Sequence, residues 1–470
     1  MRVIKSPIPQ YQPLAGLSTE TIRDFKGVNT YDSLAIPDNY FTDVSNVTND
    51  DYPTISTRPG YTVVATPVGT RCTGIGVWRG NRIVAAFNDG TWRVLTLSNT
   101  WSAAVVTFAA NDAPWSFANF QGNWDEVNLV GTNGQSGMWR FNGVTGIAVS
   151  GAPSGANFVT TYSNRLWCAV GKELHACALD QGDEWTTFAG TAEDSYVKDI
   201  ESTRGENINM LSGSLSKLTI GFPNSLVELY GNLPSDFNDR LVTDDTGVAS
   251  NRAVATQDGV MMLLHKSGIY QYTGGTIPDR DFSEIIANYP ITVDTNSVVG
   301  ADADKIYFKV GTAILVYDTR AEVRSWTVWR GINATCFVFM LGDLYIGDTS
   351  GRVLKLGGTT DNGTAISAYT ISKAFSNASI AQRQRWLKLF LTYEAAVGAT
   401  INVYLSQALS GDSDWTLVKT IVGDGTPGVQ RAMVPVDKIA LANYVRIKTE
   451  WTGVVKIHEY TRNQRALPLY

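Results

Sequence analysis

The sequence contains few of the residues on which many enzymes and nucleic-acid-binding proteins depend. Its 470 residues include three histidines and four cysteines, and charged residues make up 17%, below the roughly 25% of ordinary soluble domains. It has no Walker loop and no dinucleotide fingerprint, which argues against a nucleotide-dependent enzyme. The formal net charge is -6 and no run of basic residues could follow a phosphate backbone, so sequence-specific nucleic-acid binding is not expected.

Long apolar runs are also missing. No stretch approaches the ~20 apolar residues of a membrane-spanning helix, and the beginning of the chain has no apolar run of signal-peptide length. We therefore expect no membrane span and folding in the cytosol. Cys72, Cys168, Cys177 and Cys336 form no CxxC pair and lie in apolar, strand-like runs, so they are predicted to be buried free thiols.

Glycine and aromatic residues, by contrast, are plentiful, with 43 Gly, 13 Trp, 20 Tyr and 17 Phe. This composition favours β structure with many tight turns. RIVAAFNDGTWRVL, from residue 82, reads as a strand, an Asn-Asp-Gly turn and a second strand, which is the pattern of a β-hairpin. Comparable hairpins begin near residues 126, 165, 216, 259, 304 and 343.

The hairpins repeat at the period of a β-propeller. One apolar residue anchors each unit, and successive anchors lie 38 to 52 residues apart, against roughly 40 to 50 residues for a propeller blade. Most anchors are followed after 18 to 22 residues by a bulky residue that could open a fourth strand. We therefore predict an all-β protein with a propeller of about seven blades. The anchors are Ile83, Val127, Leu166, Leu218, Val260, Ile306 and Leu344, and the repeat aromatics are Trp101, Trp185, Phe237, Phe282 and Trp326, with Ile147 in the second unit.

The seventh unit has no such bulky residue, so another segment must close the ring. Residues 58–68, RPGYTVVATPV, precede the first unit and contain one unpaired strand candidate at 61–65. Docked as the outer strand of the last blade, this segment would cover an exposed edge. The predicted closure motif is Arg58, Pro59, Gly60 and Tyr61.

Three parts of the chain are expected. The propeller spans residues 58–364. Residues 365–470 contain seven short strand-like runs, typical of a β-sandwich of jelly-roll type. Residues 1–57 lack alternation and carry five prolines, so we expect an extended arm that becomes ordered only against a neighbour.

The densest group of possible metal ligands lies in RLWCAVGKELHACALDQGDEWTTF, residues 165–188. A two-residue turn would place Cys168 opposite His175, with Cys177 diagonal to them on the same face. These are zinc-ligand types, but a structural zinc site needs a fourth ligand, and Asp180 falls on the opposite face. Stacked blades favour small apolar residues, so core packing is the preferred interpretation and no metal or cofactor is predicted.

Other candidate sites also favour structural roles. ALDQGDEWTTF, from residue 178, resembles the Asp-box turn of sialidase propellers, which is a structural hairpin. Acid pairs such as Asp302 with Asp304 are more typical of turn caps than of calcium loops. The histidines are far apart in sequence, so no nucleophile and base arrangement is expected. Trp386, Trp415 and Trp451 are the best candidates for a binding aromatic, with core packing preferred.

The segment FKGVNTYDSLAIPDNYFTDVSNVTNDDYPTISTRPGY, residues 25–61, resembles the opening of a group of tailed-bacteriophage virion proteins. The pattern consists of three motifs in order: Gly-x-Asn, Asp-x-x-Asn, and Arg-Pro-Gly-Tyr directly before the first blade. The C-terminal runs QRQRWLKLFLTYE and VVKIHEYTRNQRALPLY are similar too. The matching N-terminal residues are Gly27, Asn29, Asp43, Asn46, Arg58, Pro59, Gly60 and Tyr61.

Members of this group look like tail nozzle or tail hub subunits, which form a ring below the portal and adaptor around the DNA exit channel. The resemblance implies a non-enzymatic virion protein, assembled in the host cytoplasm as a cyclic homo-oligomer, with a hexamer favoured. It also implies contacts with the portal adaptor and other tail proteins, and non-specific passage of viral DNA during ejection. A pI of about 5.3 agrees with a lumen that repels DNA. The alternatives are a receptor- or carbohydrate-binding tail protein and a propeller-type glycosidase.

Overall fold

The structure, a computed structural model, describes residues 16–32, 34–376, 379–409, 411, 414–439 and 441–467. The regular secondary structure of the described residues is nearly all strand, as predicted, with two short 3-10 helices. By contacts the chain divides into unit 1, residues 1–58, 325–327 and 365–470, and unit 2, residues 59–324 and 328–364. No helix in the described part is long and apolar enough to cross a membrane.

Unit 2 contains, within the described residues, seven small sheets, and in six of them the strands follow one another along the chain. In chain order the sheets are β6 (Cys72–Trp78), β7 (Arg82–Phe87), β8 (Thr91–Val94) and β9 (Val106–Thr107); β10 (Ser116–Phe120), β11 (Asn128–Thr132), β12 (Trp139–Phe141) and β13 (Gly146–Ala148); β14 (Asn157–Tyr162), β15 (Arg165–Val170), β16 (Glu173–Ala176) and β17 (Tyr196–Asp199); β18 (Met210–Ser212), β19 (Leu218–Gly221), β20 (Leu226–Tyr230) and β21 (Asn238–Thr243); β22 (Val254–Gln257), β23 (Val260–His265) and β24 (Gly268–Tyr272); β25 (Val298–Ala301), β26 (Lys305–Val310), β27 (Ala313–Asp318) and β28 (Ser325–Arg330); and β29 (Ala334–Met340), β30 (Asp343–Asp348), β31 (Val353–Leu356), β5 (Tyr61–Val63), β32 (Thr360–Asp361) and β33 (Thr364–Ala365). The 3-10 helix η1 (Asp281–Ile286) follows β24.

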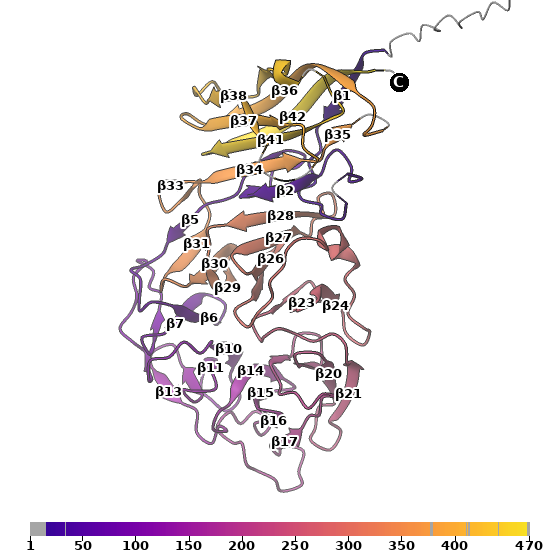
Figure 1. Cartoon of the computed structure of the whole chain (residues 1–470). Helices are drawn as coiled ribbons and strands as arrows, with labels where there is room; N and C mark the ends of the chain where they lie inside the picture. Colours follow the sequence, from indigo (N-terminus) through magenta and orange to yellow (C-terminus); the bar gives the residue numbers. More distant parts are fainter. Residues whose placement is uncertain are drawn as a thin grey trace, which may run out of the picture. The chain divides into compact units, whose positions relative to one another are not determined.

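The first strands of these sheets form a closed circuit. β6 contacts β10, β10 contacts β14, β14 contacts β18, β22 contacts β25, β25 contacts β29, and β29 returns to β6. Between the fourth and fifth sheets, Leu211 N donates to Asn251 Oδ1 at 3.1 Å, and the hydroxyls of Ser214 and Thr256 lie 2.9 Å apart. Figure 1 shows the sheets following one another around unit 2, from β6 to β31. This arrangement is the predicted β-propeller.

The predicted anchors lie on the second strand of each sheet, except Val127, which directly precedes β11. These strands are buried on both faces, and every residue of β11 is buried. Sheets stacked on either side explain this pattern, because each face then needs apolar side chains and alternation disappears.

An N-terminal strand joins the last sheet, as predicted, but β32 and β33 lie beyond it, so it is not the outer strand that we expected. β5 pairs antiparallel with β31, with Tyr61 opposite Leu356. Gly60 N donates to Gly358 O at 3.0 Å. Any Cβ on Gly60 would lie 2.1 Å from Thr360 O, so only glycine allows this close backbone approach.

The repeat aromatics do not share the predicted fourth-strand position. Trp326 lies on β28 and Phe237 directly precedes β21, but Phe282 lies on η1, and the fifth sheet has three strands. Trp101 forms an isolated bridge with Leu95 before β9. Trp185 lies well before β17, buried, with Nε1 donating to Gly182 O at 2.9 Å. An aromatic ring can pack in the core from a loop or a helix as well as from a strand. The even spacing of the repeat aromatics therefore did not locate the fourth strands.

Unit 1 consists of two sheets. Many of their apolar side chains are buried, among them Trp386, Ile457 and Val403, and the hydroxyls of Thr449 and Tyr460 link the sheets at 2.8 Å. The jelly-roll type of sandwich stays a prediction. One sheet has β3 (Val47–Thr48), β4 (Ile55–Thr57), β42 (Val455–Ala466), β36 (Gln384–Ala395) and β39 (Gln430–Val434), with β1 (Ser18–Ile22) on β42 and β40 (Leu441–Ala442) on β36; the other has β2 (Phe41–Ser45), β34 (Ser367–Ser372), β41 (Tyr444–Thr452), β37 (Thr400–Ser406) and β38 (Thr416–Val422), with β35 (Phe375–Ser376) on β41; the 3-10 helix η2 is Asp437–Ile439.

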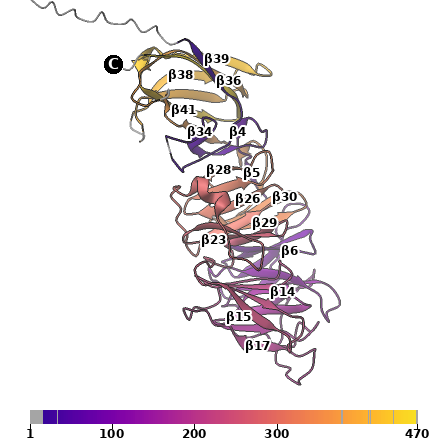
Figure 2. The ribbon, with the colours of Figure 1, turned by 90° about the vertical axis from the view of Figure 1, so that its right-hand side faces the viewer.

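The N-terminal segment differs from the extended arm that we predicted. Its described part provides β1 to β4, which pair with each other or with C-terminal strands of the same chain. In Figure 1 the indigo strands β1 and β2 lie among orange and yellow strands, and Figure 2 shows β4 beside β34. Two- and three-residue strands such as β3 and β4 are too short to show alternation, so the sequence pattern missed them. Pro7, Pro9 and Pro13 of the predicted arm lie outside the described residues.

Candidate functional site

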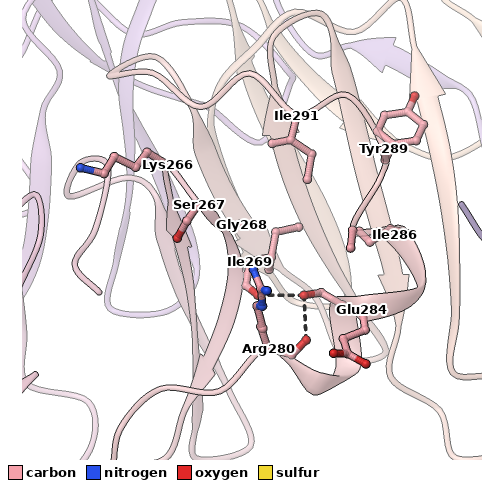
Figure 3. A pocket seen from close by; sticks show the side chains of 11 residues that line it. Lys266, Ser267, Gly268, Ile269, Arg280, Glu284, Ile286, Tyr289 and Ile291 are labelled. Carbon is pink, nitrogen blue, oxygen red and sulfur yellow. Dashed lines mark hydrogen bonds between the residues drawn. The ribbon is translucent and has the colours of Figure 1, made fainter. Parts of the chain in front are cut away.

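A small cavity lies beside η1 in unit 2. Its volume is ≈ 170 Å³, and its lining includes Ser267, Arg280, Glu284 and Tyr289. Figure 3 shows these side chains around it, while Lys266 points away from Ile269 and Arg280. The cavity therefore presents one cation, one acid and a phenol beside apolar isoleucines.

Two local features build this cavity. Lys266 and Ser267 form the two-residue turn between β23 and β24, because His265 pairs with Gly268. Ser283 Oγ donates to Ile269 O at 2.9 Å and to Arg280 O at 3.0 Å. These bonds attach the first turn of η1 to β24.

A serine and a histidine meet at this turn, which we did not expect. Ser267 Oγ lies 2.7 Å from His265 Nδ1 and 2.8 Å from Tyr270 Oη. Burial, and then the charge of Lys266, lowers the pKa of His265, so its ring is neutral at pH 7. A His-x-Ser pattern across a tight turn was the available sequence signal. Ser267 N also donates to Nδ1 at 3.4 Å, and this is the local bonding of a polar turn residue.

A second, more open cavity of ≈ 390 Å³ lies among the first strands of unit 2. Its lining combines apolar side chains, such as Phe117, Val299 and Phe337, with polar groups that include Arg252. Arg252 Nη1 donates to Thr335 O at 2.7 Å. Burial lowers the pKa of this guanidinium, which nonetheless remains charged at neutral pH.

The possible zinc ligands have the predicted register, with Cys168 opposite His175. Cys168 and Cys177 are fully buried in an apolar cluster with Leu166 and Trp185. Burial raises the pKa of both thiols, that of Cys177 to about 12, so they stay protonated. His175 Nε2 instead lies 3.1 Å from a carboxylate oxygen of the neighbouring Glu173. In the described part of the chain, no group of three or more His, Cys, Asp or Glu could hold a metal ion.

A buried acid that sequence reasoning missed joins two sheets. The Glu228 side chain on β20 is 0% exposed. Its Oε1 accepts from Lys217 Nζ and Gly275 N, both at 3.1 Å, and from the Tyr272 hydroxyl on β24. Its Oε2 accepts from the Tyr230 hydroxyl. Only Tyr230, two residues along β20, is close in sequence; the other donors come from the loop before β19, from β24 and from the loop after it, so the sequence gives no signal for them.

The predicted acid pair and Asp-box turn have structural contacts. Asp302 Oδ1 accepts from Asp304 N at 2.9 Å and from Lys305 N at 2.8 Å, which is a turn cap. In the Asp-box-like turn, Asp183 accepts from Trp124 Nε1 at 2.6 Å and from Ser150 N at 3.2 Å. These carboxylates hold loops in place.

The three candidate binding tryptophans are mostly internal. Trp386 is 1% exposed and Trp451 2%, so neither offers a ring face to a ligand. Trp415 is half-buried, with the Arg446 guanidinium 4.9 Å and the Lys448 ammonium 5.8 Å from its ring. Core packing is confirmed for Trp386 and Trp451.

Residues that carry the N-terminal resemblance make specific contacts inside unit 1. Arg58 is 2% exposed, and its Nε donates to Asn46 Oδ1 at 2.9 Å. The Tyr369 hydroxyl donates to Asp43 Oδ2 at 2.7 Å. A Cβ on Gly27 would lie 2.1 Å from the backbone oxygen of Trp326. The pattern thus selects residues that fix the backbone of the N-terminal segment.

Comparison with known proteins shows a likeness of fold. No protein-family model matches the chain, and no curated protein matches it in sequence. Among solved structures, the WD40 β-propeller domain of Doa1 is 12% identical, with 63% of this chain and 97% of that chain covered and a TM-score of 0.43. BamB from Moraxella catarrhalis is 12% identical, with 73% and 98% covered and a TM-score of 0.41. PorZ, a surface component of the type-IX secretion system of Porphyromonas gingivalis, is 11% identical, with 78% and 55% covered and a TM-score of 0.43.

Proposed function

We propose that this protein is a structural subunit of a phage tail, in the nozzle or hub. It would assemble in the host cytoplasm into a cyclic homo-oligomer that surrounds the DNA exit channel and contacts the portal adaptor and other tail proteins. A ring of this kind closes through a heterologous interface, in which different surfaces of neighbouring subunits meet. Its role is assembly and conduction of DNA rather than turnover of a substrate.

The observation that carries the proposal is the placement of the phage-like pattern. Asp43, Asn46 and Arg58 all make side-chain hydrogen bonds within unit 1, and Gly60 sits where β5 enters the last sheet. The N-terminal resemblance up to Arg58 and the C-terminal resemblance therefore fall in unit 1, while Pro59, Gly60 and Tyr61 lead into unit 2. A shared pattern that maintains architecture supports a shared architectural role.

The two alternatives draw less support from the side chains. A carbohydrate-binding protein stacks exposed aromatic rings on its ligand, and Trp386 and Trp451 are buried. A glycosidase positions two carboxyl groups on either side of the scissile bond. The predicted acid pair at Asp302 and Asp304 caps a turn instead.

The test is the assembly state of the purified full chain, measured by mass photometry and electron microscopy. We expect closed rings of one size, and immunogold labelling of virions at the tail below the portal. A protein that stays monomeric at micromolar concentration and is found only on side fibres would contradict the proposal. Release of reducing sugar from host polysaccharide would favour the glycosidase.

A further inference from the structure

Two cysteines from opposite ends of the propeller sequence meet where its first and last sheets adjoin. Cys72 begins β6, Cys336 lies on β29, and these strands are in contact. A Cβ on Gly347 would lie 2.6 Å from Cys336 Sγ and 2.7 Å from Cys72 Sγ. The two sulfurs thus share one small space that the glycine leaves open.

The surroundings distinguish the two thiols. Cys72 is fully buried, whereas Cys336 is 8% exposed and lines the central cavity together with Arg252. The hydrogen bond from Cys72 lowers the pKa of Cys336, and the Thr335 hydroxyl and the Arg252 charge add to this effect against burial. Burial raises the pKa of Cys72. Cys336 is therefore the thiol that can ionise first, and of the two it is the one that lines a cavity.

We propose that Cys72 and Cys336 are a redox-sensitive pair, which a small-molecule disulfide oxidises to a covalent link between the first and last sheets of the propeller. The link would staple the ring at the point where the chain closes it. This inference goes beyond the proposed function and does not depend on it.

The reaction is thiol–disulfide exchange and needs only a disulfide such as oxidised glutathione. The Cys336 thiolate attacks one sulfur of the oxidant, forming a mixed disulfide and releasing one small thiol. The Cys72 sulfur, losing its proton, then attacks the Cys336 sulfur and releases the second small thiol. Two protein thiols are oxidised, one disulfide is reduced, and the two protons leave on the two released thiols.

Cys168 and Cys177 provide a matched control within the same chain. Both are fully buried and close enough in sequence to share one apolar cluster. Burial raises the pKa of each. We therefore expect this second pair to resist the oxidant that links Cys72 to Cys336.

The experiment treats the folded full chain with oxidised glutathione, blocks remaining thiols by alkylation, and maps disulfides by mass spectrometry without reduction. We expect a Cys72–Cys336 peptide, loss of two hydrogen atoms from the intact mass, and a higher Tm that dithiothreitol reverses. Cross-linking a loop this long restricts the unfolded chain strongly. Cys72→Ala should stop at the mixed disulfide on Cys336, and Cys168→Ala should leave the link and the Tm increase unchanged.

Three results would overturn the inference. One is the absence of a Cys72–Cys336 bond in oxidised protein that circular dichroism shows to be folded. Another is a bond that forms only in urea, which would mean that unfolding, not native proximity, allows it. The third is equal oxidation of Cys168 and Cys177, which would mean that the Arg252 environment contributes nothing. Cys336→Ser provides a second variant if Cys72→Ala fails to fold.

Discussion

Glu228→Gln tests whether a buried carboxylate holds the fourth and fifth sheets together. The substitution keeps the shape of the side chain but removes its charge, leaving Lys217 without its ion-pair partner. Glu228 accepts hydrogen bonds from two tyrosine hydroxyls and a backbone N–H. The NH2 group of glutamine is a donor, so it would face these donors without an acceptor. Removing one partner of a buried pair costs ~3–5 kcal/mol. The Lys217 side chain is 16% exposed, so water can partly solvate its charge in the variant. We therefore expect the free energy of unfolding to fall by about 3 kcal/mol, at the lower end of that range.

The pH dependence follows from the same contacts. Burial alone would raise the pKa of Glu228, but hydrogen bonds from Tyr230, Tyr272, Gly275 and Lys217 outweigh it and lower the pKa. Its stabilising contribution is therefore fully present above the unfolded pKa of about 4.3 and is lost as the pH falls through the lower folded pKa. Wild-type Tm should fall more steeply than that of the variant as the pH drops below about 5.

Differential scanning calorimetry from pH 7 to pH 3 measures both effects. Glu126→Gln is the matched control, because Glu126 is 56% exposed in its ion pair with Arg79, and such surface pairs contribute ~0–1 kcal/mol. The double variant Glu228→Gln, Lys217→Met should recover part of the loss, since it removes the uncompensated charge. Equal Tm values for Glu228→Gln and Glu126→Gln, or parallel pH profiles for Glu228→Gln and wild type, would refute the reasoning.

Two further predictions concern ring closure and metal. Gly60→Ala should prevent β5 from pairing with β31, because the added Cβ would lie 2.1 Å from Thr360 O. Limited proteolysis should then cleave the variant within residues 59–71 faster than wild type. An unchanged cleavage rate would contradict the inference that β5 needs glycine at position 60 to pair. Elemental analysis of the purified protein should find no stoichiometric zinc, since Cys168 and Cys177 pack in an apolar cluster and no group of three or more possible ligands forms in the described part of the chain. One zinc per chain would restore Cys168, His175 and Cys177 as ligands.

The sequence predicted those features whose determinants lie close together along the chain. The two-residue turn after Val170 placed Cys168 opposite His175, and the pairing is as expected. We expected the segment before the first blade to cover an exposed edge of the last blade, and residues 61–63 of that segment do lie in the last sheet. Spacing alone failed for Phe282, because a ring can pack from a helix as well as from a strand: the half-buried Phe282 lies on η1, with its ring centroid 5.3 Å from that of Tyr317.

Features assembled from distant segments left no local signal. The donors to Glu228 come from Lys217, Tyr272 and Gly275, on separate strands and a loop. Cys72 and Cys336 become neighbours only when the ring closes. Short strands such as β4 have too few residues to show a period, and β4 pairs with β42, far along the chain.

The insertion of the propeller between two halves of unit 1 links closure of the ring to folding of that unit. Unit 1 receives strands from residues 1–58 and 365–470, and the intervening segment forms almost all of unit 2. Within unit 2, β5 at the entry pairs with both β31 and β32 at the exit. A closed propeller therefore holds residues 59 and 364 in one sheet, which removes most of the loop-closure entropy that would oppose pairing of β2 with β34. If Gly60→Ala opens the ring, the strands of unit 1 should lose hydrogen-exchange protection as well, although none of them is altered.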